Sequence, residues 1–257
     1  MIERRINISG LSALAVISDI HGNSWALDAV LEDIERRGIT NIVNLGDSIY
    51  GPLDPVGTIK RLSSKKIKSI KGNQDRVLLT PTTEVLKSKT YVYVKESLTS
   101  NDLSWIENMP ATLSFFMEEF FLCHGTPTSD ETCLLEDVTS HGVFLRSSEY
   151  ILRDLKDINE PVILCAHSHI PRTVYLSTGQ IVINPGSIGL PAYSDDFPFP
   201  HQMESGCPHA NYTILSKQYD KWIIEHIIIP YDWKTASKRA LENGREDWAK
   251  WILYGRV

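Results

Sequence analysis

Short apolar runs alternate with amphipathic segments near the start of the chain. Residues 13–18 have the length and composition of a buried strand, and residues 23–37 carry apolar side chains at helical spacing. Residues 39–45 predict a second strand, and a helix over 56–64 leads to a third strand over 66–72. This β-α-β-α-β order predicts a sheet with helices packed against its faces.

The rest of the chain predicts helices followed by further strands. Residues 73–110 are expected to be mostly helical, with Ser100 as the N-cap of a helix that Pro110 ends. Further strands are predicted at residues 111–118, 119–125, 161–169, 172–178, 180–186, 212–217 and 222–229. A helical tail over 232–257 completes what we expect to be a single domain, residues 1–257.

One segment interrupts this order. Residues 191–210 are rich in proline, contain His201 and His209, and are predicted to form a long loop insertion without structure of its own. Loops of this length often carry function. Trp248 and Trp251 in the helical tail are interpreted as packing anchors rather than as part of a site.

Composition excludes several classes of protein. The formal net charge of −6 disfavours non-specific nucleic-acid binding, because such binding needs many Lys and Arg contacts to phosphates. None of the 4 cysteines forms a C-x-x-C pair, so a thiolate zinc site is not expected. The N-terminal residues show no apolar leader, and no run reaches membrane-spanning length. We therefore expect a soluble, cytoplasmic protein with no membrane partner.

Residues that commonly bind metals follow several of the apolar runs. Asp19 and His21 follow the first run, and we expect them to lie side by side because alternate residues leaving a strand point the same way. Ligand sites gather at the carboxyl ends of strands in α/β folds, so the whole set is expected to converge there. The set comprises Asp19, His21, Asp47, Asn73, His124, His167 and His169.

Each of these residues alone has a plainer explanation, since a strand-end His is usually hydrogen-bonded and a Gly-Asp pair is usually a turn. The recurrence of the pattern indicates a site. Two carboxylates, one amide and four imidazoles are too many ligands for one metal ion, and they suit two ions if one carboxylate bridges. Such ligands without thiolate suit Mn, Fe, Zn or Ni, and the sequence does not choose among them.

The order of these motifs resembles that of the calcineurin-like metallophosphoesterase superfamily, from about residue 13 to 190. The motifs are Asp19-Ile20-His21, Gly46-Asp47 with Gly51, Gly72-Asn73, His124-Gly125 and His167-Ser168-His169. The stretches "GDSIYGPLDP", "HGTP" and "INPGSIGLP" are more similar to the bacterial phosphodiesterase branch than to the Ser/Thr protein phosphatases. The latter carry Asp-Arg-Gly near the place where Tyr50-Gly51-Pro52 stands here.

The resemblance implies a four-layer αββα sandwich, in which helices flank two mixed β-sheets. One metal ion would be held by Asp19, His21 and His169. The second would be held by Asn73, His124 and His167, with Asp47 bridging the two ions. Asp47, Asn73 and His124 are also expected to act in catalysis. Two such ions lower the pKa of a bridging water, so that hydroxide attacks phosphorus without a covalent protein nucleophile.

The predicted function is dinuclear metal-dependent hydrolysis of phosphate esters, as a phosphodiesterase or phosphatase acting on a small phosphorylated substrate. One alternative is a hydrolase of dinucleoside polyphosphates, for which Tyr193, Phe197 and Phe199 are candidate platforms for a base. Another is a catalytically weak metal-binding scaffold. A homo-oligomeric state is left open.

One position departs from the family pattern. Many members place a His after the Gly-Asn motif, where it assists protonation of the leaving group. Gln74 stands there instead, and Gln cannot act as a general acid. We therefore predict slow hydrolysis of esters with poor alkyl leaving groups. Asp75 is expected to orient a neighbouring ligand or loop, and His201 or His209 is an alternative proton donor.

Three residues are candidates for binding substrate: Asn23, Gln74 and Arg172. The Asn23 amide is placed to donate to a phosphate oxygen, although an N-cap of the following helix is the favoured alternative. Arg172 follows the last predicted ligand by three residues, and an ordinary salt bridge explains it equally well.

Overall fold

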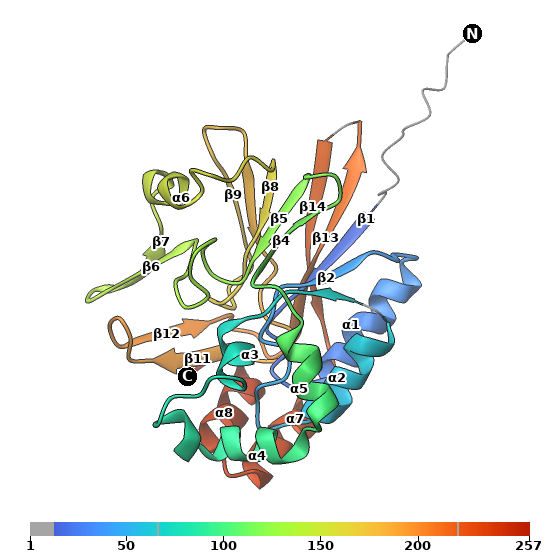
Figure 1. The fold of residues 1–257 in the computed structure, drawn as a ribbon, viewed down its shortest axis with the longest axis vertical. Helices are drawn as coiled ribbons and strands as arrows, with labels where there is room; N and C mark the ends of the chain where they lie inside the picture. Colours follow the sequence, from blue (N-terminus) through green and yellow to red (C-terminus); the bar gives the residue numbers. More distant parts are fainter. Residues whose placement is uncertain (1–12, 66, 220) are drawn as a thin grey trace.

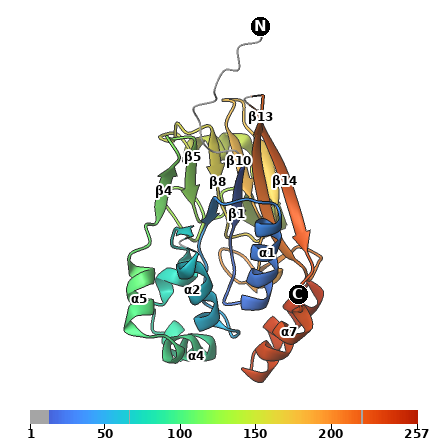
Figure 2. The ribbon, with the colours of Figure 1, turned by 90° about the vertical axis from the view of Figure 1, so that its right-hand side faces the viewer.

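Two five-stranded β-sheets pack face to face with helices outside them, so the predicted four-layer αββα sandwich of mixed sheets is confirmed (Figures 1 and 2). The structure is a computed structural model that describes residues 13–65, 67–219 and 221–257. The sequence-based expectation that the N-terminus carries no apolar leader concerns residues outside this range. No helix in the described residues has the length and apolar character needed to cross a membrane.

The first sheet has the strand order β14-β13-β1-β2-β3. Its strands are β1 (Ala13–Ile17), β2 (Ile42–Asn44), β3 (Lys68–Ser69), β13 (Ala210–Gln218) and β14 (Lys221–Ile229). The pairs β1–β2 and β2–β3 are parallel, whereas β13 pairs antiparallel with both β1 and β14. Helices α1 (Ser24–Arg36) and α2 (Pro55–Ser64) provide the crossovers between the parallel strands, as predicted.

The second sheet has the order β4-β5-β8-β10-β9. Its strands are β4 (Thr112–Phe115), β5 (Phe120–Cys123), β8 (Val162–Leu164), β9 (Arg172–Tyr175) and β10 (Ile181–Asn184). The predicted hairpins β4–β5 and β9–β10 are present. Helix α6 (Ser148–Asp154), which was not predicted, covers the outer face of this sheet through the buried side chain of Ile151.

The largest apolar layers follow from strand alternation. Leu14 and Val16 on β1 face the other sheet and pack with residues such as Phe120 on β5. Ala15 and Ile17 point to the opposite face of β1, where they pack under α1 and the C-terminal helices. Those helices are α7 (Trp233–Glu242) and α8 (Glu246–Tyr254), which confirm the predicted helical tail.

The segment 73–110 is mostly helical, as predicted. It contains α3 (Asn73–Val77), the short 3-10 helix Val85–Lys87, α4 (Lys89–Ser97) and α5 (Ser100–Glu107). The assignment of Ser100 as N-cap was wrong by one residue. Thr99 caps α5, because its hydroxyl accepts from the Asp102 backbone amide while the Asp102 carboxylate accepts from the Thr99 amide.

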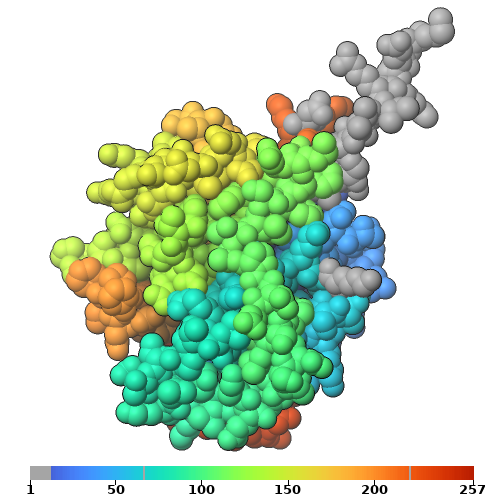
Figure 3. All heavy atoms as spheres, in the orientation of Figure 1, coloured from blue at the N-terminus to red at the C-terminus, as the bar shows by residue number. Residues whose placement is uncertain are grey.

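Two hairpins were missed. Residues 191–210 were predicted to lack structure, but they contain the antiparallel pair β11 (Ala192–Asp195) and β12 (His201–Glu204). A second hairpin joins β6 (Glu136–Thr139) to β7 (Gly142–Leu145). In the space-filling view the orange β11–β12 hairpin lies beside the yellow-green β6–β7 segment, at one margin of the molecule (Figure 3).

Candidate metal centre

The strand ends bring the predicted ligands together. Strands β1, β2, β5 and β8 end at the same margin of the sandwich, and the polar residues that follow them meet there in buried positions. Two groups of ligand atoms lie close enough to hold a metal ion. They are Asp19, His21 and His169 in one group, and Asp19, Asp47 and His124 in the other.

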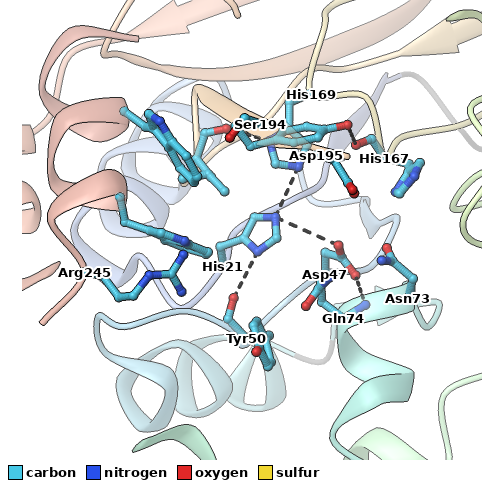
Figure 4. A pocket seen from close by; sticks show the side chains of 14 residues that line it. His21, Asp47, Tyr50, Asn73, Gln74, His167, His169, Ser194, Asp195 and Arg245 are labelled. Atoms are coloured by element: carbon cyan, nitrogen blue, oxygen red, sulfur yellow. Dashed lines mark hydrogen bonds and ion pairs between the residues drawn. The ribbon is translucent and has the colours of Figure 1, made fainter. Parts of the chain in front are cut away.

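The first group is built on the loops after β1 and β8. The Nε2 atoms of His21 and His169 are 3.2 Å apart, and the His169 Nε2 lies 3.4 Å from Asp19 Oδ1. Asp47 reaches toward this group, with its Oδ2 3.9 Å from His21 Nε2 (Figure 4). Two imidazoles and the Asp19 carboxylate thus lie within 4.8 Å of one another, and the Asp47 carboxylate approaches one of the imidazoles.

The second group lies around His124. Its Nε2 is 3.1 Å from Asn73 Oδ1 and 3.4 Å from Asp47 Oδ2. The His167 ring stands next to it, with ring centroids 5.3 Å apart. Asp47 therefore approaches a histidine of each group, and Asp19 belongs to both groups, with its Oδ1 4.0 Å from His124 Nε2. The bridging role predicted for Asp47 stays a prediction.

Each of the four imidazoles is oriented by a backbone carbonyl. The Nδ1 atoms of His21, His124 and His169 lie 3.0, 2.8 and 2.7 Å from the carbonyl oxygens of Tyr50, Leu45 and Leu190. His167 uses the other nitrogen, because its Nε2 lies 3.1 Å from the Glu131 carbonyl. A carbonyl only accepts, so each of these ring nitrogens carries a hydrogen. The Nε2 atoms of His21, His124 and His169 are thereby turned toward the buried carboxylates of Asp19 and Asp47.

Two observations show that these residues fit a cation. In His21 and His169 the Nδ1–H group donates to a carbonyl, so each Nε2 atom carries a lone pair. The two Nε2 atoms are 3.2 Å apart, and a positive charge between them would remove the repulsion of their lone pairs. Both carboxylate oxygens of Asp19 are buried without a hydrogen-bond partner among the described residues. A buried carboxylate in that state is costly unless a cation is bound to it.

The protonation states agree with this arrangement. Burial and neighbouring imidazoles lower the pKa of His21 and of His167 to about 4, so both are neutral near pH 7. Burial lowers the pKa of His124 as well, but the carboxylates of Asp47 and Asp19 outweigh it and raise that pKa to about 10. A metal ion that binds His124 would therefore displace a proton.

The backbone at the site differs from the expectation. Asp19 and His21 were expected to lie side by side through strand alternation, but β1 ends at Ile17 and the two residues have φ values of 50° and 52°. Asp47, His167 and His169 also have positive φ, from 51° to 71°. Five of the seven predicted ligands thus occupy left-handed turns, a conformation that non-glycine residues adopt mainly where surrounding structure enforces it.

Asp75 holds two of the ligand loops together, as predicted. Its side chain is fully buried and accepts from the backbone amides of Ser48 and Gly72, at 3.0 and 3.1 Å. These amides adjoin Asp47 and Asn73. Burial and the nearby Asp47 carboxylate raise the pKa of Asp75 to about 7.

The predicted substrate-binding residues lie in different environments. Gln74 lines the site, and its backbone amide donates to Asp47 Oδ1 at 2.8 Å. Asn23 is fully buried and caps α1, while its amide donates to the Gly189 carbonyl and to the Tyr231 hydroxyl. The favoured N-cap alternative is therefore the one observed, and no donor of the Asn23 amide is left for a phosphate.

Arg172 forms an ordinary salt bridge, the alternative to a substrate-binding role, with its Nε 3.0 Å from Glu136 Oε1. It lines neither of the two cavities described below. Of the two loop histidines, His201 lines the larger cavity, whereas His209 packs edge-on against Trp233 at 4.7 Å between ring centroids.

Two cavities meet at the metal centre. The smaller has a volume of about 260 Å³ and the larger about 1240 Å³. They share a boundary formed by Asn73, Gln74, His167, Tyr193 and Asp195. Arg245 and Trp248 also line the smaller cavity, which was not predicted because nothing local in the sequence shows that the C-terminal tail returns to the site.

Residues 13–199 match the calcineurin-like phosphoesterase superfamily domain, and the chain belongs to this superfamily. The protein is therefore a phosphoesterase of a metal-dependent family, with ligand groups in place for metal. It is similar to the uncharacterized protein MJ0912 of Methanocaldococcus jannaschii, at 27% identity over 260 residues, which cover 92% of this chain and 95% of that protein.

Solved structures share the fold. A metallophosphoesterase from Sphaerobacter thermophilus superposes with a TM-score of 0.73 at 20% identity, covering 95% of this chain and 99% of that one. The hypothetical protein PH1004 from Pyrococcus horikoshii OT3 gives a TM-score of 0.73 at 22% identity, with the same coverage. Both matches cover more of this chain than residues 13–199, which match the superfamily domain.

Proposed function

We propose that the protein is a dinuclear metal-dependent phosphodiesterase acting on a small phosphorylated substrate. The observation that carries the proposal is a set of three imidazoles, His21, His124 and His169, whose Nδ1 atoms bond to backbone carbonyls while their Nε2 atoms lie 3.4 to 3.9 Å from the buried carboxylates of Asp19 and Asp47. One ion would be held by Asp19, His21 and His169, and the other by Asn73, His124 and His167, with Asp47 shared. Bound ions would supply Lewis acidity and a water of lowered pKa.

The protein's own residues fix the geometry of this reaction. Asp75 holds the loops of Asp47 and Asn73, and the carbonyl contacts fix the imidazole planes, so little reorganisation is needed when substrate binds. Gln74 lines both cavities and offers an amide that can donate to a phosphoryl oxygen but cannot protonate a leaving group. This favours substrates whose leaving group departs without a proton.

The larger cavity argues against the dinucleoside polyphosphate alternative. Among the described residues that line it, six carry carboxylates and one is an arginine. That arginine, Arg146, is already paired with Asp154 at 2.7 Å. Two of the six carboxylates, Glu131 and Glu136, are paired with Arg76 and Arg172, and the other four add negative charge to the cavity. Because further phosphates would be repelled there, we infer that a single phosphoryl group is handled at the centre. We also propose that the protein acts in the cytoplasm and belongs to the bacterial phosphodiesterase-like branch of the superfamily.

The test is a comparison of substrates on protein freed of metal and then loaded with Mn, Fe, Zn or Ni. We expect hydrolysis of an aryl phosphodiester with at least one metal, faster than hydrolysis of a diadenosine polyphosphate. Asp47→Asn should lose most of this activity and part of the bound metal. Asp157→Asn removes the same charge from a side chain that is 85% exposed, and serves as the matched control. Full activity in Asp47→Asn would refute the shared-ligand assignment.

A further inference from the structure

The smaller cavity has aromatic walls beside the metal centre. Tyr50, Tyr193, Trp248 and Trp251 line it together with the ligands His21 and His169 (Figure 4). Its volume of about 260 Å³ lies just below the usual range of ligand pockets, roughly 300–1,000 Å³. It therefore has the size for a phosphoryl group with one ring system and not for a long chain.

The C-terminal helix α8 forms one side of this cavity and lies directly against a metal-ligand loop. The Trp248 ring meets the His21 ring edge-on, with centroids 5.6 Å apart. A Cβ at Gly51 would lie 2.0 Å from the His21 carbonyl oxygen and 3.0 Å from the Trp248 ring, so a glycine lets this loop pack closely against both. Asn243 before α8 donates to the Pro52 carbonyl at 2.8 Å and anchors the tail on the same loop.

Arg245 is the one arginine or lysine among the described residues that line this cavity. Asp247 holds its guanidinium at 2.9 and 2.6 Å, and the group lies 5.2 Å from the Trp248 ring centroid. A further N–H donates to the Thr90 hydroxyl. Three of the five guanidinium N–H groups are thus engaged, and two are left to donate from a fixed plane.

These walls differ from those of the larger cavity, which is acidic and lies across the shared boundary of Asn73, Gln74 and His167. Aromatic rings recognise a planar group, and a fixed arginine donates to acceptors on its edge. An anionic substituent is a weaker fit, because Asp247 already offsets the charge of Arg245.

We propose, building on the phosphodiesterase function above, that this cavity is a subsite for a nucleobase carried on one ester arm of the substrate. Arg245 and Trp248 are its specificity-determining residues. Both lie beyond residue 199, where the match to the superfamily domain ends, so the subsite is a feature that the C-terminal helices add to the common centre.

The test measures binding rather than turnover. Calorimetry of the Mn-loaded protein compares AMP with ribose 5-phosphate, which has the same phosphate and sugar but no base, and chromatography afterwards checks that each ligand is intact. We expect AMP to bind roughly 5- to 150-fold more tightly, the range that one base–aromatic contact supplies. Arg245→Met should bring AMP close to ribose 5-phosphate and leave the latter unchanged.

A second variant and a matched control separate the subsite from loss of fold. Trp248→Phe keeps an aromatic ring in the core and should reduce the AMP preference only in part. Arg239→Met removes an arginine of α7 that also faces an acid, Glu242 at 3.9 Å, but does not line the cavity, and should keep the wild-type preference.

Two results would overturn the subsite: equal affinities for AMP and ribose 5-phosphate in the wild type, or equal weakening of both by Arg245→Met. Aryl phosphodiester hydrolysis by the same preparation tells the two proposals apart. Hydrolysis without base preference refutes the subsite alone, whereas base preference without hydrolysis on any metal refutes the phosphodiesterase proposal.

Discussion

A buried tyrosine–aspartate contact fastens helix α1 to strand β13, and its removal is expected to weaken the fold measurably. Tyr212 is fully buried, and its hydroxyl donates to Asp33 Oδ2 at 2.5 Å. The same carboxylate accepts from Arg37 at 2.7 Å and from Arg36 at 3.1 Å. Tyr212→Phe deletes the hydroxyl and keeps the ring, so the change isolates this one hydrogen bond.

The expected loss follows from the charge on the acceptor. A hydrogen bond to a charged group contributes about 1.5–3 kcal/mol, and Asp33 keeps its two arginine partners in the variant. We therefore expect Tyr212→Phe to lower the free energy of unfolding by about 2 kcal/mol. For a chain of this size that corresponds to a fall in Tm of about 4–8 °C.

The effect should depend on pH. Burial raises the pKa of Asp33, but the hydrogen bonds from Tyr212 and Arg37 outweigh it, so the pKa lies below its ordinary value of 3.8. A carboxyl with a depressed pKa contributes stability that is fully present above its unfolded pKa and is lost as pH falls through the folded pKa. The difference between wild type and Tyr212→Phe should therefore be constant from about pH 5 to 7 and shrink below about pH 4.

Urea unfolding followed by circular dichroism, at fixed metal concentration, measures this difference. Arg36→Met is the matched control, because its side chain is 73% exposed and its bond to Asp33 is a surface ion pair, expected to contribute less than about 1 kcal/mol. A loss below about 0.5 kcal/mol for Tyr212→Phe at pH 7, or a difference that grows in acid, would refute the reasoning.

Three further outcomes are expected. Adding Mn²⁺ to chelator-treated protein at about 100 times its Kd should raise the free energy of unfolding by about 2.7 kcal/mol, seen as an increase in Tm that Asp47→Asn diminishes. Gly72→Ala places a Cβ 2.2 Å from Asp47 Oδ1, so metal content measured by atomic spectrometry should fall together with activity. Gln74→His should raise kcat/KM for an alkyl ester relative to an aryl ester by roughly tenfold or more, and an unchanged ratio would show that the absent general acid is not limiting.

Regular periodicity explains which elements could be predicted from the sequence. The prediction for α1, residues 23–37, lies within one residue of the observed Ser24–Arg36, because its apolar stripe packs on the sheet and Asn23 caps it. The β11–β12 hairpin was missed because Pro198 and Pro200 in its turn region suggest a loop. Its two strands pair with each other, and the hairpin also packs against β7 and α8, which are distant in sequence and leave no local signal.

The candidate site could be predicted as a set of ligands but not as a shape. Asp19, Asp47 and His124 each follow an apolar strand, so their convergence followed from the strand ends alone. Trp248 was interpreted as a packing anchor, and it does pack in the core while also lining the smaller cavity. Trp248 lines the cavity because the C-terminal tail packs against the loop of Gly51. This is a tertiary contact between distant parts of the chain, so the local sequence does not predict it.

Hydrogen bonds from other loops enforce the left-handed turns that carry the ligands. A left-handed conformation costs a non-glycine residue about 1–2 kcal/mol, and Asp19 and His21 both adopt it. Their amides are held by the carbonyls of Gly46 and Asp47 at 3.0 and 2.9 Å, and the Asp19 carbonyl accepts from Gly189 at 3.0 Å. Bonds from two other loops thus enforce the conformation. Folding therefore supplies most of the free energy needed to order the ligands, and metal binding supplies little of it. Because the ligand loops are rigid, a methyl group at Gly72 should displace Asp47 and weaken metal binding.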